Sequence, residues 1–180
     1  MKKDIRICGF GGQGVILSGF IIGKAAAVFM DFHAVQSQSY GPEARGGAAR
    51  SEIVISDQKI GYPRPTSVDL LVAMSQQSFD SYRDDIRDDT VIIVDPDLVT
   101  DHDIGRSVYT VRAQKIAEEL GNKIVTNIVM VGAAVSIFSL LDIEAVKKAV
   151  IDSVPKRFIE LNTKAFEKGV QAGKNAVKGL

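Results

Sequence analysis

The chain alternates short apolar runs that are typical of strands with longer apolar segments that are typical of helices. Residues 4–9 alternate as a short strand, and residues 15–30 contain only Ser18 and Lys24 as polar side chains. An apolar segment of this length predicts a helix. The two segments therefore predict a strand–helix unit at the start of the chain.

This predicted helix does not suit a membrane. Lys24 interrupts it, and a bilayer requires about 20 consecutive apolar residues. Gly19 and Gly23 lie four positions apart, a spacing that lets a helix approach its neighbour closely. We therefore expect this helix to pack tightly on a sheet, and we expect no membrane partner.

Several further strands follow, and their patterns differ. The runs 68–74 and 90–94 are almost continuously apolar, which indicates central strands of a sheet covered on both faces. A short helix over 76–87 joins them. A turn around Gly61 and Pro63 predicts a hairpin after the alternating run 48–56. The remaining strand patterns occupy residues 33–38 and 107–111.

The last third of the chain predicts helices. A helix over 113–120 ends at Gly121, a residue favoured just beyond a helix end. The segment 127–141 is apolar on every side, so we expect another subunit to cover it. Two amphipathic helices complete the chain, over 142–153 and from Pro155 onward.

These elements predict the fold class. Strands alternate with helices, as in α/β proteins built on parallel sheets. With 180 residues, 46% of them hydrophobic, the chain fits one domain with a sizeable core. We predict a single three-layer, Rossmann-like α/β domain over 1–180, with a largely parallel sheet and C-terminal helices.

Charge and cysteine content exclude several classes of function. Lys and Arg number 22, as do Asp and Glu, so there is no basic excess for nucleic acid. The N-terminus lacks the apolar stretch of a secretory signal, which predicts a cytoplasmic protein. Cys8 is the single cysteine, too few for an iron–sulfur cluster, and it is best interpreted as a small buried hydrophobe.

The first candidate for chemistry is the segment GFGGQG between the first strand and helix. Gly9, Gly11 and Gly14 spell G-x-G-x-x-G, with Gly12 and Gln13 inside the turn. Glycines let backbone N–H groups approach a phosphate at the positive end of the following helix. The same glycines also suit tight strand–helix packing without any ligand.

A dinucleotide site would need one more group. An acidic residue at the end of the second strand normally grips the ribose of NAD. Here Asp31 precedes that strand, and the strand ends in Gln36, Ser37 and Gln38. The sequence therefore disfavours an NAD-dependent reductase.

A second glycine-rich segment follows the second strand. We expect it to form a rigid polar loop near the first turn, because loops after parallel strands gather at one sheet edge. Arg45 and Arg50 then either add cationic donors to a phosphate site or are solvated surface charges. The loop residues are Tyr40, Gly41, Pro42, Glu43, Arg45, Gly46 and Gly47.

Other catalytic arrangements lack support. His33 and His102 are the only histidines, too few for a histidine-rich zinc site. Asp97, Asp101 and Asp103 crowd one stretch without the ordered spacing of a calcium loop, so a solvated turn is expected. No catalytic residue and no metal ligand is assigned.

The two glycine-rich segments together carry a resemblance. GFGGQG, then SQSYGPEARGG, RSEIVIS, IGYP and VIIVDPD resemble the gamma subunit of 2-oxoacid:ferredoxin oxidoreductases along nearly the whole chain. A separate chain of this length, without a ferredoxin extension, is most similar to the 2-oxoglutarate type. The pyruvate and 2-oxoisovalerate types are the alternatives within the family.

The resemblance implies a subunit that is inactive alone. The family converts a 2-oxoacid, coenzyme A and oxidised ferredoxin into acyl-CoA, CO2 and reduced ferredoxin. It implies thiamine diphosphate on the alpha and beta partners, iron–sulfur clusters on a beta or delta partner, and a gamma chain that helps to form the coenzyme A site. The implied binding residues are Gly9, Gly11, Gly12, Gln13, Gly14, Tyr40, Gly41, Glu43, Arg45, Gly46 and Gly47. A stand-alone nucleotide- or acyl-carrier-binding module is the alternative outside the family.

Overall fold

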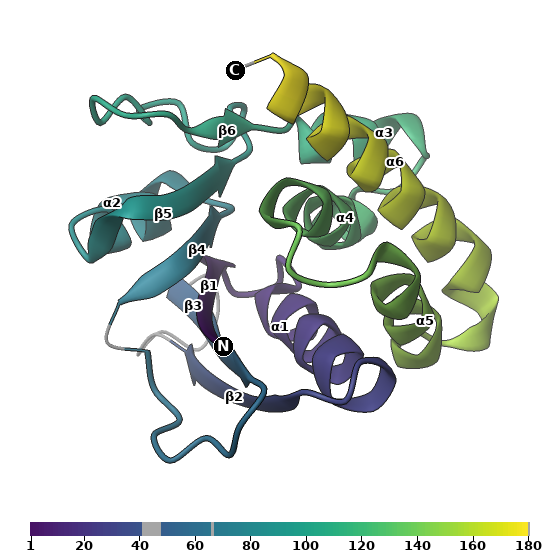
Figure 1. The fold of residues 1–180 in the computed structure, drawn as a ribbon. Helices are drawn as coiled ribbons and strands as arrows, with labels where there is room; N and C mark the ends of the chain where they lie inside the picture. The colour runs from purple at the N-terminus through teal and green to yellow at the C-terminus, as the bar shows by residue number, and fades with distance from the viewer. Residues whose placement is uncertain (41–47, 66, 180) are drawn as a thin grey trace.

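Six strands form one sheet in the order β2-β3-β1-β4-β5-β6, in a computed structural model that describes residues 1–40, 48–65 and 67–179 (Figure 1). Strand β3 runs antiparallel to both of its neighbours, whereas the β1–β4, β4–β5 and β5–β6 pairs are parallel. The predicted largely parallel sheet is therefore confirmed. The strands are β1 (Lys2–Phe10), β2 (His33–Tyr40), β3 (Ala48–Ser56), β4 (Val68–Ala73), β5 (Ile86–Val94) and β6 (Tyr109–Thr110).

The predicted hairpin around Gly61 and Pro63 is wrong. Strands β3 and β4, which flank that turn, do not pair, because β1 lies between them. The antiparallel partners of β3 are β2 and β1. Alternation in the run 48–56 identified a strand correctly but contained no information about its neighbours.

Helices cover the two faces of the sheet unequally. A large apolar core lies between the sheet and most of the helices, and a smaller one lies beneath α2 and the segment that follows β5. Because one core lies on each face of the sheet, the domain has the predicted three layers of helices, sheet and helices. On the larger side lie α1 (Val15–Lys24) with a π-helical continuation (Ala25–Phe29), α3 (Ala113–Glu119), α4 (Thr126–Phe138), α5 (Ile143–Ser153) and α6 (Ile159–Lys178); α2 (Gln76–Tyr82) covers the other side.

One helix boundary differs clearly from the prediction. Helix α2 ends at Tyr82 rather than near residue 87, because β5 already begins at Ile86. The register between β4 and β5 shifts there, so that residues 87–90 bulge out of the ladder. The predicted helix 15–30 is confirmed to within one residue, because α1 and the π-helical segment that continues it run from Val15 to Phe29.

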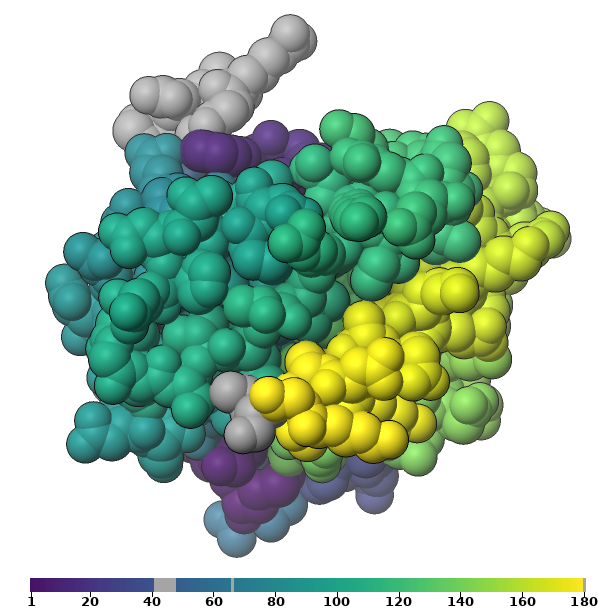
Figure 2. Space-filling view, turned by 90° about the horizontal axis from the view of Figure 1, so that it is seen from above, coloured from purple at the N-terminus to yellow at the C-terminus, as the bar shows by residue number. Residues whose placement is uncertain are grey.

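Helix α4 is the central helix of the domain. Every residue from Thr126 to Val135 is buried, and α6 packs along it. A Cβ atom on Gly132 or Gly169 would collide with backbone of the facing helix, so these glycines allow the two helices to touch. The expectation that another subunit covers this segment is wrong: helices of the same chain cover it. In Figure 2, α6 also lies beside α3 on the outside of the molecule.

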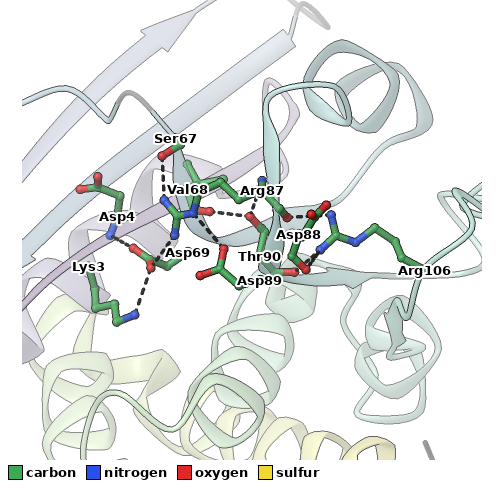
Figure 3. A network of polar contacts seen from close by, with 10 residues as sticks. All are labelled: Lys3, Asp4, Ser67, Val68, Asp69, Arg87, Asp88, Asp89, Thr90 and Arg106. Carbon is green, nitrogen blue, oxygen red and sulfur yellow. Dashed lines mark hydrogen bonds and ion pairs between the residues drawn. The ribbon is translucent and has the colours of Figure 1, made fainter.

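A polar network secures the amino ends of the strands (Figure 3). The Arg87 guanidinium donates hydrogen bonds to Ser67 Oγ at 2.7 Å and Asp69 Oδ1 at 2.8 Å. Arg106 donates to the carbonyls of Arg87 and Asp88 and so holds the bulge of β5. This edge is structural, and the candidate site lies at the opposite, carboxyl edge.

Candidate functional site

The glycine-rich turn leaves β1 at its carboxyl end and enters α1. Gly12 and Gly14 have φ angles of 97° and 73°, the left-handed region that glycine adopts without strain. The N–H of Gln13 donates to the carbonyl of Phe10 at 3.1 Å and closes the turn. The backbone angles of the turn therefore explain the glycines at positions 12 and 14.

The side chain of Gln13 holds the turn in place. Its Oε1 accepts a hydrogen bond from the Phe10 N–H at 2.6 Å, and its Nε2 donates to the Met74 carbonyl at 2.8 Å. Met74 directly follows β4, so this amide ties the turn to the neighbouring strand. Because both ends of the Gln13 amide are used inside the protein, we assign it a positioning role.

Helix α4 reaches the same turn. Asn127 Nδ2 donates to the Gly14 carbonyl at 3.3 Å, and Ser18 donates to that carbonyl from its N–H at 2.9 Å. A side chain on Gly14 would collide with Asn127, which is 3% exposed. The beginning of α1 is thus fixed by β1, β4 and α4 together.

The geometry leaves backbone donors available. Gly11 and Gly12 are exposed, and within the described ranges no hydrogen-bond acceptor is recorded for their N–H groups. No side chain caps the start of α1 either. Backbone N–H groups at the positive end of a helix favour an anion. Anion binding by this turn stays a prediction, and the exposed position of Gly11 and Gly12 is compatible with it.

A hollow of about 270 Å³ opens beside the turn. It lies at the point where β1 and β4 diverge into α1 and α2, the usual place for ligands in open α/β sheets. Among the described residues, the lining contains no carboxylate, and Lys123 is its one charged residue. The lining residues are Gly12, Gln13, Met74, Leu98, Gln114, Lys123, Ile124 and Thr126.

Two side chains that line the hollow, Lys123 and Gln114, share the Glu118 carboxylate as their acceptor. Lys123 Nζ lies 2.9 Å from Glu118 Oε1, and Gln114 Nε2 donates to the same oxygen at 3.1 Å. The hydrogen bond from Lys123 lowers the pKa of Glu118. Sequence reasoning missed Gln114, Lys123 and Asn127, because only the fold brings them to a turn more than 100 residues earlier.

The second predicted segment is placed only in part. Tyr40 ends β2 and is 63% exposed, at the same sheet edge as the turn. Arg50 lies elsewhere, with its Nε 3.7 Å from Glu52 and its guanidinium over the Tyr82 ring. Its proposed phosphate contact is not supported, since it belongs to the α2 side. Gly41, Glu43, Arg45, Gly46 and Gly47 fall outside the described residues.

The strand order also argues against NAD. In a dinucleotide fold the ribose contact comes from the strand next to β1. Here β3 separates β2 from β1, which moves the end of β2 about 10 Å from the turn at the usual strand spacing. The missing acidic residue and the position of β3 between β1 and β2 both argue against an NAD site at this turn.

Metal and redox centres do not fit the residues present. Burial raises the pKa of the Cys8 thiol to about 12, so it is neither a thiolate ligand nor a nucleophile. In the described part of the chain no three His, Cys, Asp or Glu side chains gather to hold a metal ion. Asp97, Asp101 and Asp103 are exposed turn residues, as predicted. No helix in those same ranges is long and apolar enough to cross a membrane.

Comparison with known sequences identifies similar proteins. The family described as pyruvate ferredoxin/flavodoxin oxidoreductase matches residues 4–172. The 2-oxoglutarate synthase subunit KorC of Methanocaldococcus jannaschii is 49% identical over 178 residues, which cover 97% of this chain and 95% of that protein. The ketoisovalerate oxidoreductase subunit VorA of Methanothermobacter thermautotrophicus is 30% identical, and the match covers 97% of this chain but 37% of VorA.

Solved structures share the fold. The gamma subunit of a keto/oxoacid ferredoxin oxidoreductase from Geobacter sulfurreducens superposes with a TM-score of 0.90 at 41% identity, over 98% of both chains. The 2-oxoglutarate:ferredoxin oxidoreductase of Magnetococcus marinus, solved with 2-oxoglutarate, coenzyme A and succinyl-CoA, gives a TM-score of 0.88 at 24% identity. That match covers 97% of this chain and 31% of the Magnetococcus chain.

Proposed function

Because this chain belongs to the pyruvate ferredoxin/flavodoxin oxidoreductase family, we propose that it is the gamma subunit of a 2-oxoglutarate:ferredoxin oxidoreductase. The family predicted from the glycine-rich segments is confirmed. The complex converts 2-oxoglutarate, coenzyme A and oxidised ferredoxin into succinyl-CoA, CO2 and reduced ferredoxin. It works in the cytoplasm.

The substrate assignment rests on one comparison. Identity to the KorC subunit is 49%, whereas identity to VorA is 30%. The higher identity to KorC favours the 2-oxoglutarate type. The pyruvate and 2-oxoisovalerate types remain the alternatives that the assay must separate.

The redox cofactors belong to partner subunits. An iron–sulfur cluster requires several thiolates, and the one thiol of this chain is buried and protonated. Thiamine diphosphate is usually held through Mg²⁺ and carboxylates, and no carboxylate lines the hollow beside the turn. We therefore assign both groups to alpha, beta or delta partners, which also deliver electrons to ferredoxin.

The chain itself contributes to the coenzyme A site. The support is the fixed glycine-rich turn with exposed N–H groups next to an open hollow, an arrangement suited to a phosphate. Coenzyme A supplies phosphates and, on release, carries the acyl group away. What this chain does is bind and orient one end of it.

The test is to purify the native complex through a tag on this chain and to identify its subunits. The complex is then assayed for coenzyme A-dependent ferredoxin reduction with 2-oxoglutarate, pyruvate and 2-oxoisovalerate in turn. A preference for 2-oxoglutarate is expected. A complex that reduces ferredoxin with pyruvate faster than with 2-oxoglutarate would overturn the substrate assignment, and purification of the chain without any partner would overturn the subunit role.

A further inference from the structure

The hollow beside the glycine-rich turn is lined on one side by a positively charged side chain, Lys123, which no sequence motif predicts. Lys123 begins a short 3₁₀ turn (Lys123–Val125) that leads into α4, and it lines the hollow together with Gly12 and Gln13. Of the eight lining residues it alone is charged. The turn offers N–H donors, and Lys123 offers a full positive charge at the same opening.

Lys123 forms an ion pair with Glu118 that an incoming anion can readily replace. The Lys123 side chain is 67% exposed and that of Glu118 is 42% exposed, so their ion pair is screened by water. Exposed ion pairs of this kind contribute little to stability. Gln114 also points its Nε2 at the Glu118 carboxylate. Glu118 Oε1 thus accepts hydrogen bonds from both Lys123 and Gln114, the two side chains that an incoming anion would use.

We propose that Lys123 and Gln114 bind a phosphate group of coenzyme A across the hollow from the glycine-rich turn, and that Glu118 holds both donors until the ligand displaces it. This rests on the proposed function. Lysine suits the role because its ammonium is a mobile point charge on a flexible stem that can follow a phosphate. The contacts of Lys123 with Glu118 and with a phosphate are both charge-assisted, and the phosphate would also gain the N–H donors of the turn across the hollow.

The experiment uses the assembled complex, purified by size so that only intact assemblies are assayed. In Lys123→Gln the KM for coenzyme A should rise about tenfold with kcat unchanged, because the lost contact is equally present in ground and transition states. In Glu118→Gln the KM should fall, by about twofold, because the competing carboxylate is gone. Lys115→Gln, an exposed change on α3 outside the hollow, is the matched control and should leave both constants unchanged.

The outcomes separate this inference from the function on which it rests. If Gly14→Val or Arg45→Ala raises the KM for coenzyme A but Lys123→Gln does not, the role of Lys123 is refuted and the coenzyme A site stands. If none of these variants changes the KM, the coenzyme A contact of this chain is refuted as a whole. A rise in Lys123→Gln that vanishes at 0.5 M NaCl, together with a fall in Glu118→Gln, supports the inference.

Discussion

Asp4 is a buried carboxyl group that lowers the stability of the folded protein. Its side chain is on β1 with the residue 7% exposed, and within the described ranges its Oδ1 has no hydrogen-bond partner. Lys2 lies 3.4 Å from the other carboxylate oxygen but is itself half exposed, so it compensates only in part. Burial raises the pKa of Asp4. The folded protein therefore holds the proton of this carboxyl more tightly than the unfolded chain does.

We predict that Asp4→Asn increases the free energy of unfolding at pH 7 by about 1 kcal/mol. A carboxyl with a raised pKa in the folded state loses stability as pH rises through the interval between its unfolded and folded pKa values. The difference between variant and wild type should therefore vanish below about pH 3, where the carboxyl is protonated in both states. Urea unfolding between pH 3 and 7 measures this.

Asp57 provides a control of opposite sign. The N-terminal ammonium donates to its carboxylate at 2.7 Å, which lowers the pKa of Asp57. Asp57→Asn should therefore not stabilise the protein at pH 7. If Asp4→Asn destabilises at pH 7, or if both variants behave alike, the burial argument for Asp4 fails.

We predict that substitutions in the two glycine-rich segments weaken the binding of coenzyme A and leave turnover unchanged. Replacing Arg45 by Ala should raise the KM for coenzyme A about tenfold and leave kcat unchanged, as for a uniform binding contact. Gly14→Val should do more harm, because Gly14 has a positive φ and its side-chain position is filled by Asn127. Kinetics on intact complexes decide this: an unchanged KM in Arg45→Ala would reject its role.

Sequence reasoning located this turn but could not describe its supports. The spacing of Gly9, Gly11 and Gly14 between a strand and a helix is a local signal, and the structure places the turn as predicted. The hydrogen bond from Gln13 to Met74 and that from Asn127 to Gly14 join residues 61 and 113 positions apart. Such contacts depend on strand order and helix packing, which no local pattern encodes.

At the scale of elements, the packing of α4 against α6 organises the helical layer. Gly132 on α4 and Gly169 on α6 each face backbone of the other helix, so the two axes approach closely. The apolar pattern of 127–141 predicted burial correctly. It could not say what covers the helix, because an all-round apolar helix suits a domain centre and a subunit interface equally.

We predict that Gly169→Ala lowers the free energy of unfolding by about 2–3 kcal/mol, because the new methyl group overlaps the Val129 backbone and forces the helices apart. Gly61→Ala is the matched control. Nothing lies within 4 Å of the methyl group it would add, and it should be neutral or slightly stabilising. Thermal and urea unfolding of both variants measure the difference; equal stability would show that the helices separate at no cost.

At the scale of the whole molecule, the candidate site lies at one edge of the sheet, and the rest of the domain supports that edge. The Arg87 and Arg106 network secures the amino edge of its sheet (Figure 3). The opposite, carboxyl edge carries the turn, the hollow and Tyr40. Within the described residues, no three potential metal ligands gather and the one thiol is buried. This agrees with the proposal that the reactive groups of the complex lie on partner subunits.

The most direct test is to compare the pure chain with the reconstituted complex for 2-oxoglutarate-dependent reduction of ferredoxin or a viologen dye, together with iron analysis of each. We expect no activity and no iron in the isolated chain, and coenzyme A-dependent activity once the partner subunits are added. Dye reduction with 2-oxoglutarate by the isolated chain, or partner subunits that are fully active without it, would refute the role of this chain as a subunit that is inactive alone.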